Sequence, residues 1–379
     1  MSRTTKGCGC AGAVLVVILG AAAFVGVKYV RPWLNARPPA PTGELQVHIL
    51  DVGPVNGDSI LIVSPTGKTV LIDAGDTGKG KGVLEALKRY NIQQLDFFIA
   101  THPHPDHIGA ADEVFKGMKV LNVIDNGLSP NVPESLAPKP AATPALKKQP
   151  APKKPDKRPT VTKFFDEYKD ALTQSGAKYE QAEPGKTYDL GGGALLTILA
   201  PTLPYFTKEQ MKGGGNEPNA NSIVTRLDYG AFSLLLPADA EEQTEHRLLT
   251  KDLNLHAEVI KVSHHGSKYA TAADFLQRVK PKAAIISCGE WNRYGHPAQA
   301  VLDRLKSAGV KIYRTDLQGE ITITTKGREN DFQVKTAKEA TSDLWVGREP
   351  QKDDSSRVGF IAYGDFGPPP RERKAPRGK

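Results

Sequence analysis

Apolar and polar positions alternate along most of the chain in short runs that predict strands separated by a smaller number of helices. Residues 44–52, ELQVHILDV, alternate with a period of two, which is typical of a strand with one buried face. Val83, Leu84, Leu87 and Tyr90 recur at helical spacing instead. Strands precede helices in each of two successive stretches, so the pattern predicts one folded body made of two halves.

The longest apolar run lies near the N-terminus, at residues 11–27, and carries no charge. With the three residues that follow, it reaches the length of about 20 that spans a bilayer as a helix. We therefore expect residues 1–43 to form a membrane anchor and a proline-rich tether, with the folded body outside the cytoplasm. The alternative is a signal peptide cleaved after the small residues 21–23, which would leave a secreted or periplasmic protein.

Two stretches lack apolar periodicity and are rich in proline and basic residues. Residues 128–160 contain nine prolines and seven lysines or arginines, and the chain ends in GPPPRERKAPRGK. Such composition cannot bury enough apolar surface to form a core, which predicts disorder. We expect residues 44–336 to form one domain with a disordered insert at 128–160, followed by a basic tail at 337–379.

The positive charge of the chain lies mainly in these appendages. The formal net charge is +8, but residues 1–43, 128–160 and 367–379 carry more than that among them, so the folded body is mildly acidic. The overall charge therefore gives no indication of a nucleic-acid groove built into the fold. Only one of the three cysteines, Cys288, lies in the body, which excludes a disulfide framework and a four-cysteine zinc site there.

A cluster of polar donors follows the apolar run LDFFIA in the segment THPHPDHIGA, residues 101–110. His102 and His104 are two positions apart, so in extended backbone both imidazoles project to the same side and can bind one ion. Asp106 and His107 lie on the turn that follows, within reach of a second ion about 3.5–4 Å away. Four donors in so short a segment predict a metal site.

Two other apolar runs also end in candidate donors. LLLPADA places Asp239 after a strand, where its carboxylate can bridge two cations or, alternatively, cap the next helix. VIKVSHHGS places His264 and His265 after a third strand. A residue at a strand end points either into the site or away from it, so we expect one ligand and one substrate-facing group. We favour His264 as the ligand.

HPHPDH matches the HxHxDH signature of the metallo-β-lactamase fold superfamily. The later segments NANSIVTRLDYG, KVSHHGS, NRYGHP and RTDLQG extend the likeness, and roughly residues 45–325 resemble the soluble hydrolase domain of the ComEC/Rec2 competence family. This resemblance implies an α/β fold, the four-layer αββα sandwich, with two divalent metal ions, Zn²⁺ or Mn²⁺, at one edge. The ligands it implies are His102, His104, Asp106, His107, Asp239 and either His264 or His265.

The sequence departs from the pattern of that family at three points. The opening motif of that family is usually DVGQGDS, and the corresponding segment here, DVGPVNGDS, carries two extra residues. The bridging aspartate, Asp239, follows Ala238 where glycine is usual. Residues 108–238 contain no histidine, although many members of the superfamily have a ligand there. Asn219, Asn221 or water could fill that corner, so we expect one metal to be less fully coordinated. A weakly held ion makes Mn²⁺ a serious rival of Zn²⁺.

The expected chemistry is hydrolysis, because two cations that share a water lower its pKa and offset charge in the transition state. We expect Asp106 to orient the hydroxide, and His265 and His296 to be the candidates for protonating the leaving group. Asp73 is expected to support the ligand loop by hydrogen bonds, and Asp51 and Asp58 to lie at turns or behind the ligands.

The leading functional hypothesis is a metal-dependent phosphodiesterase or nuclease that acts on DNA outside the cytoplasm. The same chemistry would also serve hydrolysis of a small ester, thioester, lactone or β-lactam. A third hypothesis is a surface-anchored protein that binds DNA or cell wall through a vestigial metal site. The sequence predicts nucleic acid and the membrane as partners, and it leaves the substrate and the oligomeric state open.

Overall fold

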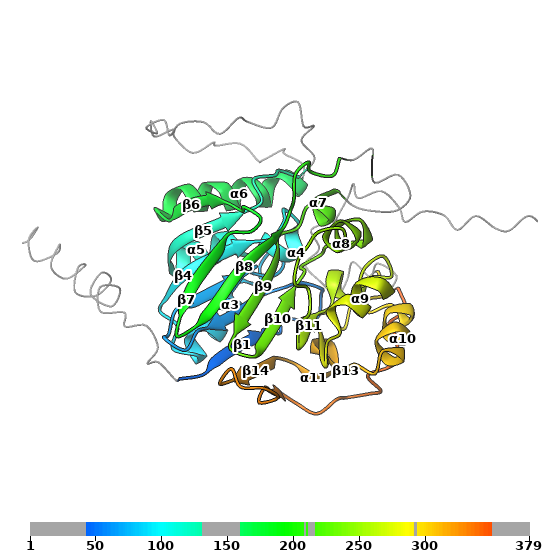
Figure 1. Ribbon diagram of the computed structural model, residues 1–379. Coiled ribbons are helices and arrows are strands. Elements are labelled where there is room, and N and C mark those ends of the chain that lie inside the picture. The colour runs from blue at the N-terminus through cyan, green and yellow to red at the C-terminus, as the bar shows by residue number, and fades with distance from the viewer. Residues whose placement is uncertain (1–42, 131–159, 208–209, 211–216, 292–293, 351–379) are drawn as a thin grey trace, which may run out of the picture.

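The computed structural model describes most of the expected body of the protein (Figure 1). The described residues are 43–130, 160–207, 210, 217–291 and 294–350. The expected N-terminal membrane segment, nearly all of the proline-rich insert and the tail beyond Pro350 lie outside these ranges. Among the described residues, no helix combines the length and the apolar composition that crossing a membrane requires.

The strands of the described residues form two sheets, one of eight strands and one of seven. The first sheet has the spatial order β15 (Gln333–Thr336), β14 (Ile321–Thr325), β1 (Leu45–Ile49), β2 (Ile60–Val63), β3 (Thr69–Ile72), β4 (Gln94–Ala100), β5 (Lys119–Asp125) and β6 (Lys178–Gln181). The second has the order β13 (Lys311–Arg314), β12 (Ala283–Ile286), β11 (Val259–Lys261), β10 (Phe232–Leu236), β9 (Val224–Tyr229), β8 (Ala194–Ala200) and β7 (Thr187–Gly191).

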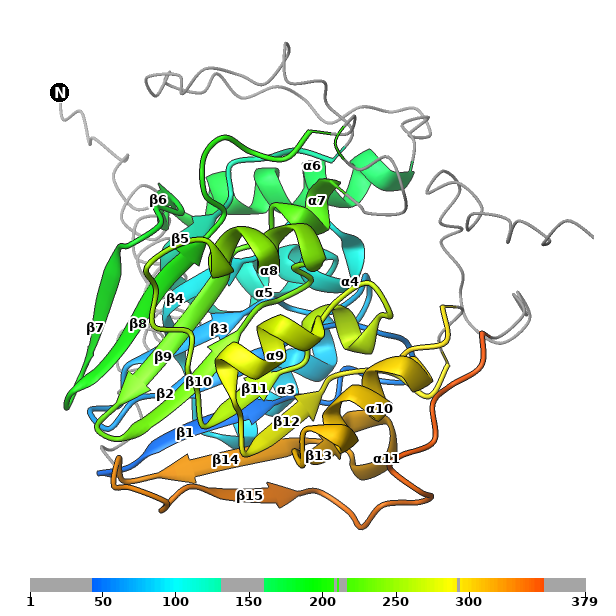
Figure 2. The same ribbon diagram turned by 45° about the vertical axis from the view of Figure 1, so that its right-hand side comes forward.

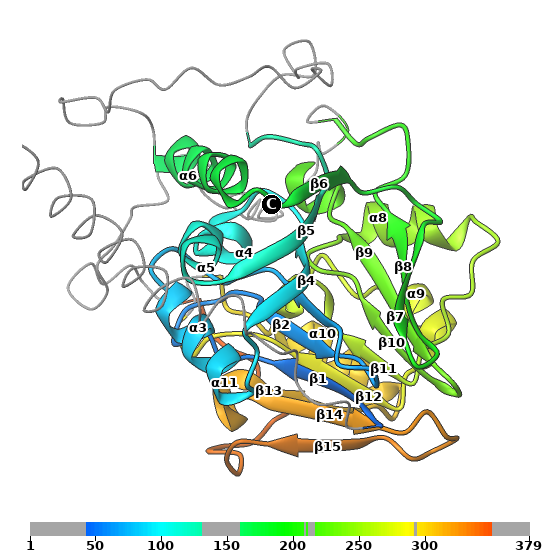
Figure 3. The ribbon, with the colours of Figure 1, turned by 90° about the vertical axis from the view of Figure 1, so that its left-hand side faces the viewer.

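Helices cover the outer face of each sheet, and three short ones lie at turns. The helices are α3 (Gly80–Arg89), α4 (Pro105–Ile108), α5 (Ala111–Gly117), α6 (Thr160–Ser175), α7 (Glu217–Ala220), α8 (Glu242–Leu249), α9 (Ala273–Val279), α10 (Gln299–Ser307) and α11 (Thr315–Gln318), with a 3₁₀ turn at Ser263–Gly266. Helices α8, α9 and α10 lie over the second sheet (Figure 2). On the far side, α3, α5 and α6 cover the first sheet (Figure 3).

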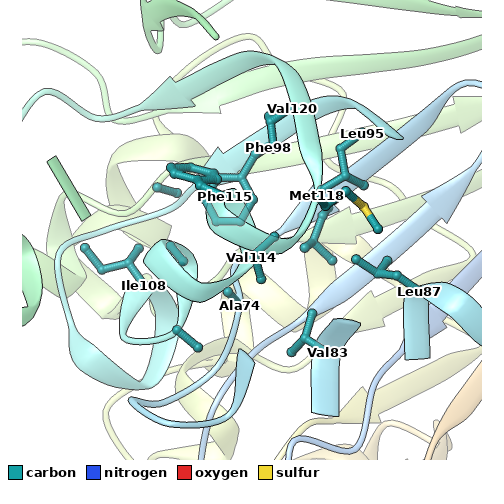
Figure 4. Close-up of a cluster of buried hydrophobic side chains, with 14 of the residues drawn as sticks. Ala74, Val83, Leu87, Leu95, Phe98, Ile108, Val114, Phe115, Met118 and Val120 are labelled. Atoms are coloured by element: carbon teal, nitrogen blue, oxygen red, sulfur yellow. The ribbon is translucent and has the colours of Figure 1, made fainter. Parts of the chain in front are cut away.

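Three apolar cores hold these four layers together. One lies between α3, α5, α6 and the first sheet, one between the two sheets, and one between the second sheet and α8, α9 and α10. In the first core, Phe98 of β4 and Phe115 of α5 meet edge to face with ring centroids 4.9 Å apart (Figure 4). The expected α/β fold, a four-layer αββα sandwich, is confirmed.

Each sheet contains a parallel part whose strands end at the same edge of the molecule. Strands β3, β4, β5 and β6 are parallel neighbours, as are β10, β11, β12 and β13. Since parallel strands present their carboxyl ends together, the residues that follow β3, β4, β10 and β11 meet there. This topology assembles polar residues from distant parts of the sequence.

The folded body continues past the C-terminal boundary expected at residue 336. The buried Arg314 guanidinium donates hydrogen bonds to the carbonyl oxygens of Leu344 and Val346, at 2.8 and 2.6 Å. Arg348 in turn donates to Asp316 Oδ2 at 2.7 Å. Besides these polar contacts, only Leu344 and Trp345 of the segment pack against the third core, which is too few to leave a periodic apolar pattern in the sequence. The basic tail therefore begins later than we expected.

Candidate metal centre

The strand ends bring together all the histidines and carboxylates that the sequence singled out as ligands. Asp73 follows β3, and His102, His104, Asp106 and His107 follow β4, the last three on or beside the short helix α4. The residues that follow β10 and β11 are Asp239 and the pair His264 and His265. The loop before α10 adds His296, whose ring centroid lies 5.2 Å from that of His264.

His102 and His104 form one half of the centre. His102 Nε2 lies 2.9 Å from His104 Nδ1, and the two side chains are only 1% and 8% exposed. Burial lowers the pKa of His104 to about 4 and the pKa of His102 well below its usual value. Both rings are therefore neutral at physiological pH, which is the state that binds a metal ion.

Four side chains form the second half: Asp106, His107, Asp239 and His265 place ligand atoms within 4.8 Å of one another. His107 Nε2 lies 3.2 Å from Asp239 Oδ1, and His265 Nε2 lies 3.4 Å from Asp106 Oδ2. Within the part of the chain that the structure describes, His107 Nε2, His265 Nε2 and Asp239 Oδ1 are buried and make no hydrogen bond. Buried polar atoms rarely lack a partner, so this donor set fits a divalent cation.

Hydrogen bonds to Nδ1 fix the orientation of the His107 and His265 imidazoles. His107 Nδ1 lies 2.7 Å from Asp73 Oδ2, and Asp73 Oδ1 accepts a hydrogen bond from Thr101 N at 2.8 Å. His265 Nδ1 donates to the carbonyl oxygen of Ser287 at 2.9 Å. Each contact leaves Nε2 as the atom that faces the other donors, which is how proteins orient histidine ligands. Asp73 lies where we expected it, behind the ligand loop.

The carboxylates also control the charge of His107. Burial lowers the pKa of His107, but Asp239 and Asp73 outweigh it and raise that pKa well above its usual value. Asp239 has its own pKa lowered by His265 and His107, against the opposing effect of burial. Binding of a cation through Nε2 of His107 is therefore expected to compete with protonation of this imidazole.

The two adjacent histidines are placed differently from what the strand pattern indicated. His265, which we did not favour as the ligand, supplies Nε2 to the four-donor group. His264 is more exposed and lies beside it, with Nε2 3.6 Å from Asp239 Oδ2 and Nδ1 3.4 Å from Glu241 Oε1. The alternation of an extended strand does not apply, because both residues have a positive φ, 48° and 52°.

The corner that lacks a histidine is lined by Asn219 but not by Asn221. Asn219 Nδ2 lies 3.3 Å from His264 Nε2 and donates to Glu241 Oε1 at 3.2 Å. Asn221 instead donates to and accepts from the backbone of Phe206, at 2.9 Å each. Of the two asparagines named from the sequence, only Asn219 reaches the centre, and His264 lies next to it.

His296 is enclosed at the mouth of the centre. Its side chain is 7% exposed, and its Nδ1 lies 3.5 Å from Asn56 Nδ2. Burial, together with His264 and His265, lowers the pKa of His296 well below its usual value. An amide hydrogen on Nδ1 favours the neutral form that carries its proton on Nε2.

Two buried charged residues near the donors, Lys261 and Glu245, were not identified from the sequence. Lys261 of β11 is 1% exposed and pairs with Asp58, and its Nζ lies 3.7 Å from Asp239 Oδ1. Glu245 of α8 is fully buried and accepts hydrogen bonds from Ser263 Oγ and from the N–H groups of two residues beyond the histidine pair. The sequence signal that could have identified Lys261 was its position as a single lysine inside the apolar run VIKVS.

Comparison with known proteins agrees with the fold and the motif. The profile of the metallo-β-lactamase superfamily matches residues 52–197, a stretch that includes the HPHPDH motif. It also resembles competence proteins of the ComEC/Rec2 family over about three quarters of its length. Members of that superfamily are typically metal-dependent hydrolases, and the donors above are the candidate metal ligands of this chain.

The individual relatives are much longer than this chain. ComE operon protein 3 of Bacillus subtilis is 29% identical over 78% of this chain and 35% of its own length. Competence protein ComA of Neisseria gonorrhoeae is 26% identical over 77% and 35%, and recombination protein 2 of Haemophilus influenzae is 28% identical over 73% and 28%. The chain thus spans about a third of the length of these curated relatives.

Solved structures with a similar chain trace are more distant in sequence. The metallo hydrolase Igni18 of Ignicoccus hospitalis is 15% identical, with a TM-score of 0.40 over 74% of this chain and 98% of that one. Zn²⁺-bound PqqB of Methylobacterium extorquens is 10% identical, with a TM-score of 0.41 over 73% and 99%.

Proposed function

We propose that this protein is a phosphodiesterase that hydrolyses nucleic acid with the help of two divalent metal ions, Zn²⁺ or Mn²⁺. The observation that carries the proposal is the group of buried imidazole and carboxylate atoms that lack hydrogen-bond partners among the described residues. The names of these relatives, which refer to competence and recombination, favour DNA as the substrate.

The proposal assigns the ligands to two positions. His102 and His104 would hold one ion, and Asp106, His107 and His265 the other, with Asp239 between them. His264 lies beside Asp239, and Asn219 lies beside His264, at the corner where many members of the superfamily have a further histidine ligand. When bound, the ions would activate a water molecule and offset the negative charge of the phosphoryl group.

Two side chains are placed to act on the reacting groups, one on the attacking water and one on the leaving oxygen. The Asp106 side chain is 21% exposed, whereas that of Asp239 is 2% exposed. Asp106 can therefore accept a proton from the attacking water. His265 uses Nε2 in the donor group and Nδ1 on Ser287, which leaves no nitrogen for the leaving group. Nε2–H of His296 is therefore the group that can donate a hydrogen bond to the leaving oxygen and offset its developing negative charge.

The decisive experiment is a metal analysis of the purified full-length chain followed by a substrate panel. The panel contains single-stranded DNA, duplex DNA, RNA, a simple ester and a β-lactam, each with Mn²⁺, Zn²⁺ or EDTA. We expect cleavage of nucleic acid that EDTA abolishes and that Asp239→Asn removes. A chain that holds metal, leaves DNA intact and cleaves the ester would exclude the nuclease and favour a small-molecule hydrolase. Metal binding or DNA binding without any hydrolysis would favour the binding protein.

We also propose that the domain is anchored outside the cytoplasm. The support is the uncharged apolar run at residues 11–27, flanked by basic residues. Fractionation of cells that produce the full chain, with protease added from outside, tests this. A protein that stays inside the cytoplasm and protected from protease would contradict it.

A further inference from the structure

Three aromatic rings form a column that leads from the surface to the four-donor group. The Tyr294 and His296 rings are inclined by 26°, with centroids 5.7 Å apart. The His296 and His265 rings are inclined by 25°, with centroids 6.5 Å apart. Both pairs have the nearly parallel orientation that is typical of offset stacking, and the first also has its spacing.

Exposure changes sharply along this column. The Tyr294 side chain is 53% exposed, His296 is 7% exposed and His265 is 1% exposed. Tyr294 therefore presents part of its ring to solvent while it stacks on a buried histidine. The two inner rings belong to the candidate metal centre, whereas Tyr294 has no part in the proposed chemistry.

Two backbone hydrogen bonds hold the C-terminal side of the loop that carries Tyr294 and His296. Ala298 N donates to Gly266 O at 2.8 Å, which ties the loop to the histidine pair. Arg348 N donates to Pro297 O at 3.0 Å, which ties it to the C-terminal segment. His296 is buried and the backbone that follows it is held, so the ring on which Tyr294 stacks is in place before a ligand arrives.

We propose that Tyr294 is a stacking platform for one base of single-stranded nucleic acid. The inference rests on the proposed function, and it adds the feature of the substrate that is recognised. The centroid steps of 5.7 and 6.5 Å place the Tyr294 ring at most about 12 Å from His265, close enough for a base near the cleaved phosphodiester. Every base offers a flat face, and in single strands this face is free to stack on protein rings.

The geometry favours a single strand over a duplex. A base inside a duplex is stacked on both faces and must be unstacked before it can meet a protein ring. Stacking uses the flat face that every base shares, so the platform is expected to tolerate any sequence. The platform thus selects for strand state and not for sequence.

Binding of a short fluorescent oligo(dT) to the full-length protein in EDTA tests the platform without hydrolysis. The comparison ligand is an abasic oligomer with the same number of phosphates. We expect wild-type protein to bind oligo(dT) about tenfold more tightly than the abasic oligomer. Tyr294→Ala should abolish this difference, and Tyr294→Phe should keep it because the ring remains.

Kinetics with Mn²⁺ provide an independent measurement. Tyr294→Ala should raise KM for oligo(dT) about tenfold and leave kcat unchanged, since the ring binds substrate and does not take part in the chemistry. Leu195→Ala is the control, because Leu195 is 40% exposed at the start of β8, at the opposite end of the sheet from the donors. Thermal unfolding of each variant identifies any loss of structure.

The outcomes separate this inference from the proposed function. Equal binding and equal cleavage of base-containing and abasic oligomers would overturn the platform and leave the nuclease intact. Preferential binding of oligo(dT) that depends on Tyr294, without cleavage under any metal condition, would uphold the platform and overturn the nuclease. Binding and cleavage of neither oligomer would overturn both.

Discussion

Lys261 and Asp58 form an ion pair that is almost completely excluded from solvent, with both side chains 1% exposed. Lys261 lies in β11 of the second sheet, and Asp58 precedes β2 of the first, so the pair joins the sheets behind the candidate metal centre. Lys261 Nζ also donates to Ala238 O at 3.1 Å. One buried ammonium group thus offsets the negative charge of both Asp58 and Asp239.

Replacing this lysine should destabilise the fold. Lys261→Met keeps the length of the side chain but leaves Asp58 buried without its cation, which typically costs about 3–5 kcal/mol. We expect that loss in the free energy of unfolding, measured by guanidinium denaturation in EDTA. Adding Asp58→Leu should restore part of the stability, because the uncompensated carboxylate is then gone.

The matched control is the ion pair of Lys282 and Glu258, whose Nζ–Oε1 distance is 3.0 Å. The Lys282 side chain is 51% exposed, so solvent screens this pair. Lys282→Met should cost less than about 1 kcal/mol. Equal losses for the two lysine variants would show that burial does not make the first pair important.

Asp73→Asn should weaken metal binding by about 10–100-fold, because the amide no longer orients His107 as a carboxylate does. Asp73 has a φ of 59°, and asparagine tolerates this left-handed conformation, so the backbone is preserved. Competition with a chelating dye measures the affinity for Zn²⁺ or Mn²⁺.

Asp96→Asn is the control for that variant. Like Asp73, Asp96 accepts hydrogen bonds from a threonine. Thr69 N donates to Asp96 Oδ2 at 2.8 Å, and Thr69 Oγ1 donates to the same oxygen at 3.1 Å. It lies near the start of β4, away from the end that carries the donors. If both variants lowered metal affinity equally, the effect would reflect general destabilisation and not the orientation of His107.

The two adjacent histidines should differ in their effect on metal content. His265→Ala removes a nitrogen from the four-donor group and should lower the content by about one ion per chain. His264→Ala should retain more metal, since His264 lies beside that group. His246→Ala, on the surface of α8 with 58% exposure, is the control. A larger loss of metal for His264→Ala than for His265→Ala would contradict our assignment.

Glu245 should make stability depend on pH. Burial raises its pKa from 4.5 to about 7, against the opposing hydrogen bonds from Ala272, Thr271 and Ser263. Between these values the folded state keeps a proton that the unfolded state has lost, so stability falls as pH rises from about 4.5 to about 7. This loss in the free energy of unfolding approaches about 3 kcal/mol above pH 7.

Glu245→Gln removes this titration, although it also weakens the hydrogen bonds to the backbone. The difference in unfolding free energy between Glu245→Gln and wild type should therefore shift in favour of the variant as pH rises from 5 to 8. Guanidinium denaturation of both proteins across this range in EDTA measures the shift. Parallel pH profiles for the two proteins would contradict a raised pKa at Glu245.

The sequence was informative wherever the chemistry is local. His102, His104, Asp106 and His107 lie within one turn after a strand, so spacing and strand geometry alone indicated a common site. The apolar runs before Asp239 and before the histidine pair also predicted strand ends, and parallel strands bring such ends together. The layer architecture came from a family resemblance that these same motifs carry.

Tertiary structure alone decided the features that depend on distant partners or on unusual backbone. His265 and His264 could not be told apart from sequence, because a left-handed turn replaces the strand geometry there. Lys261 reads as an ordinary lysine until Asp58, from the other half of the chain, is placed against it. The sequence by itself therefore determined which donors exist and at which edge they meet. Only the packing of the two sheets decided which atoms face one another, because burial and charge pairing are properties of the assembled fold.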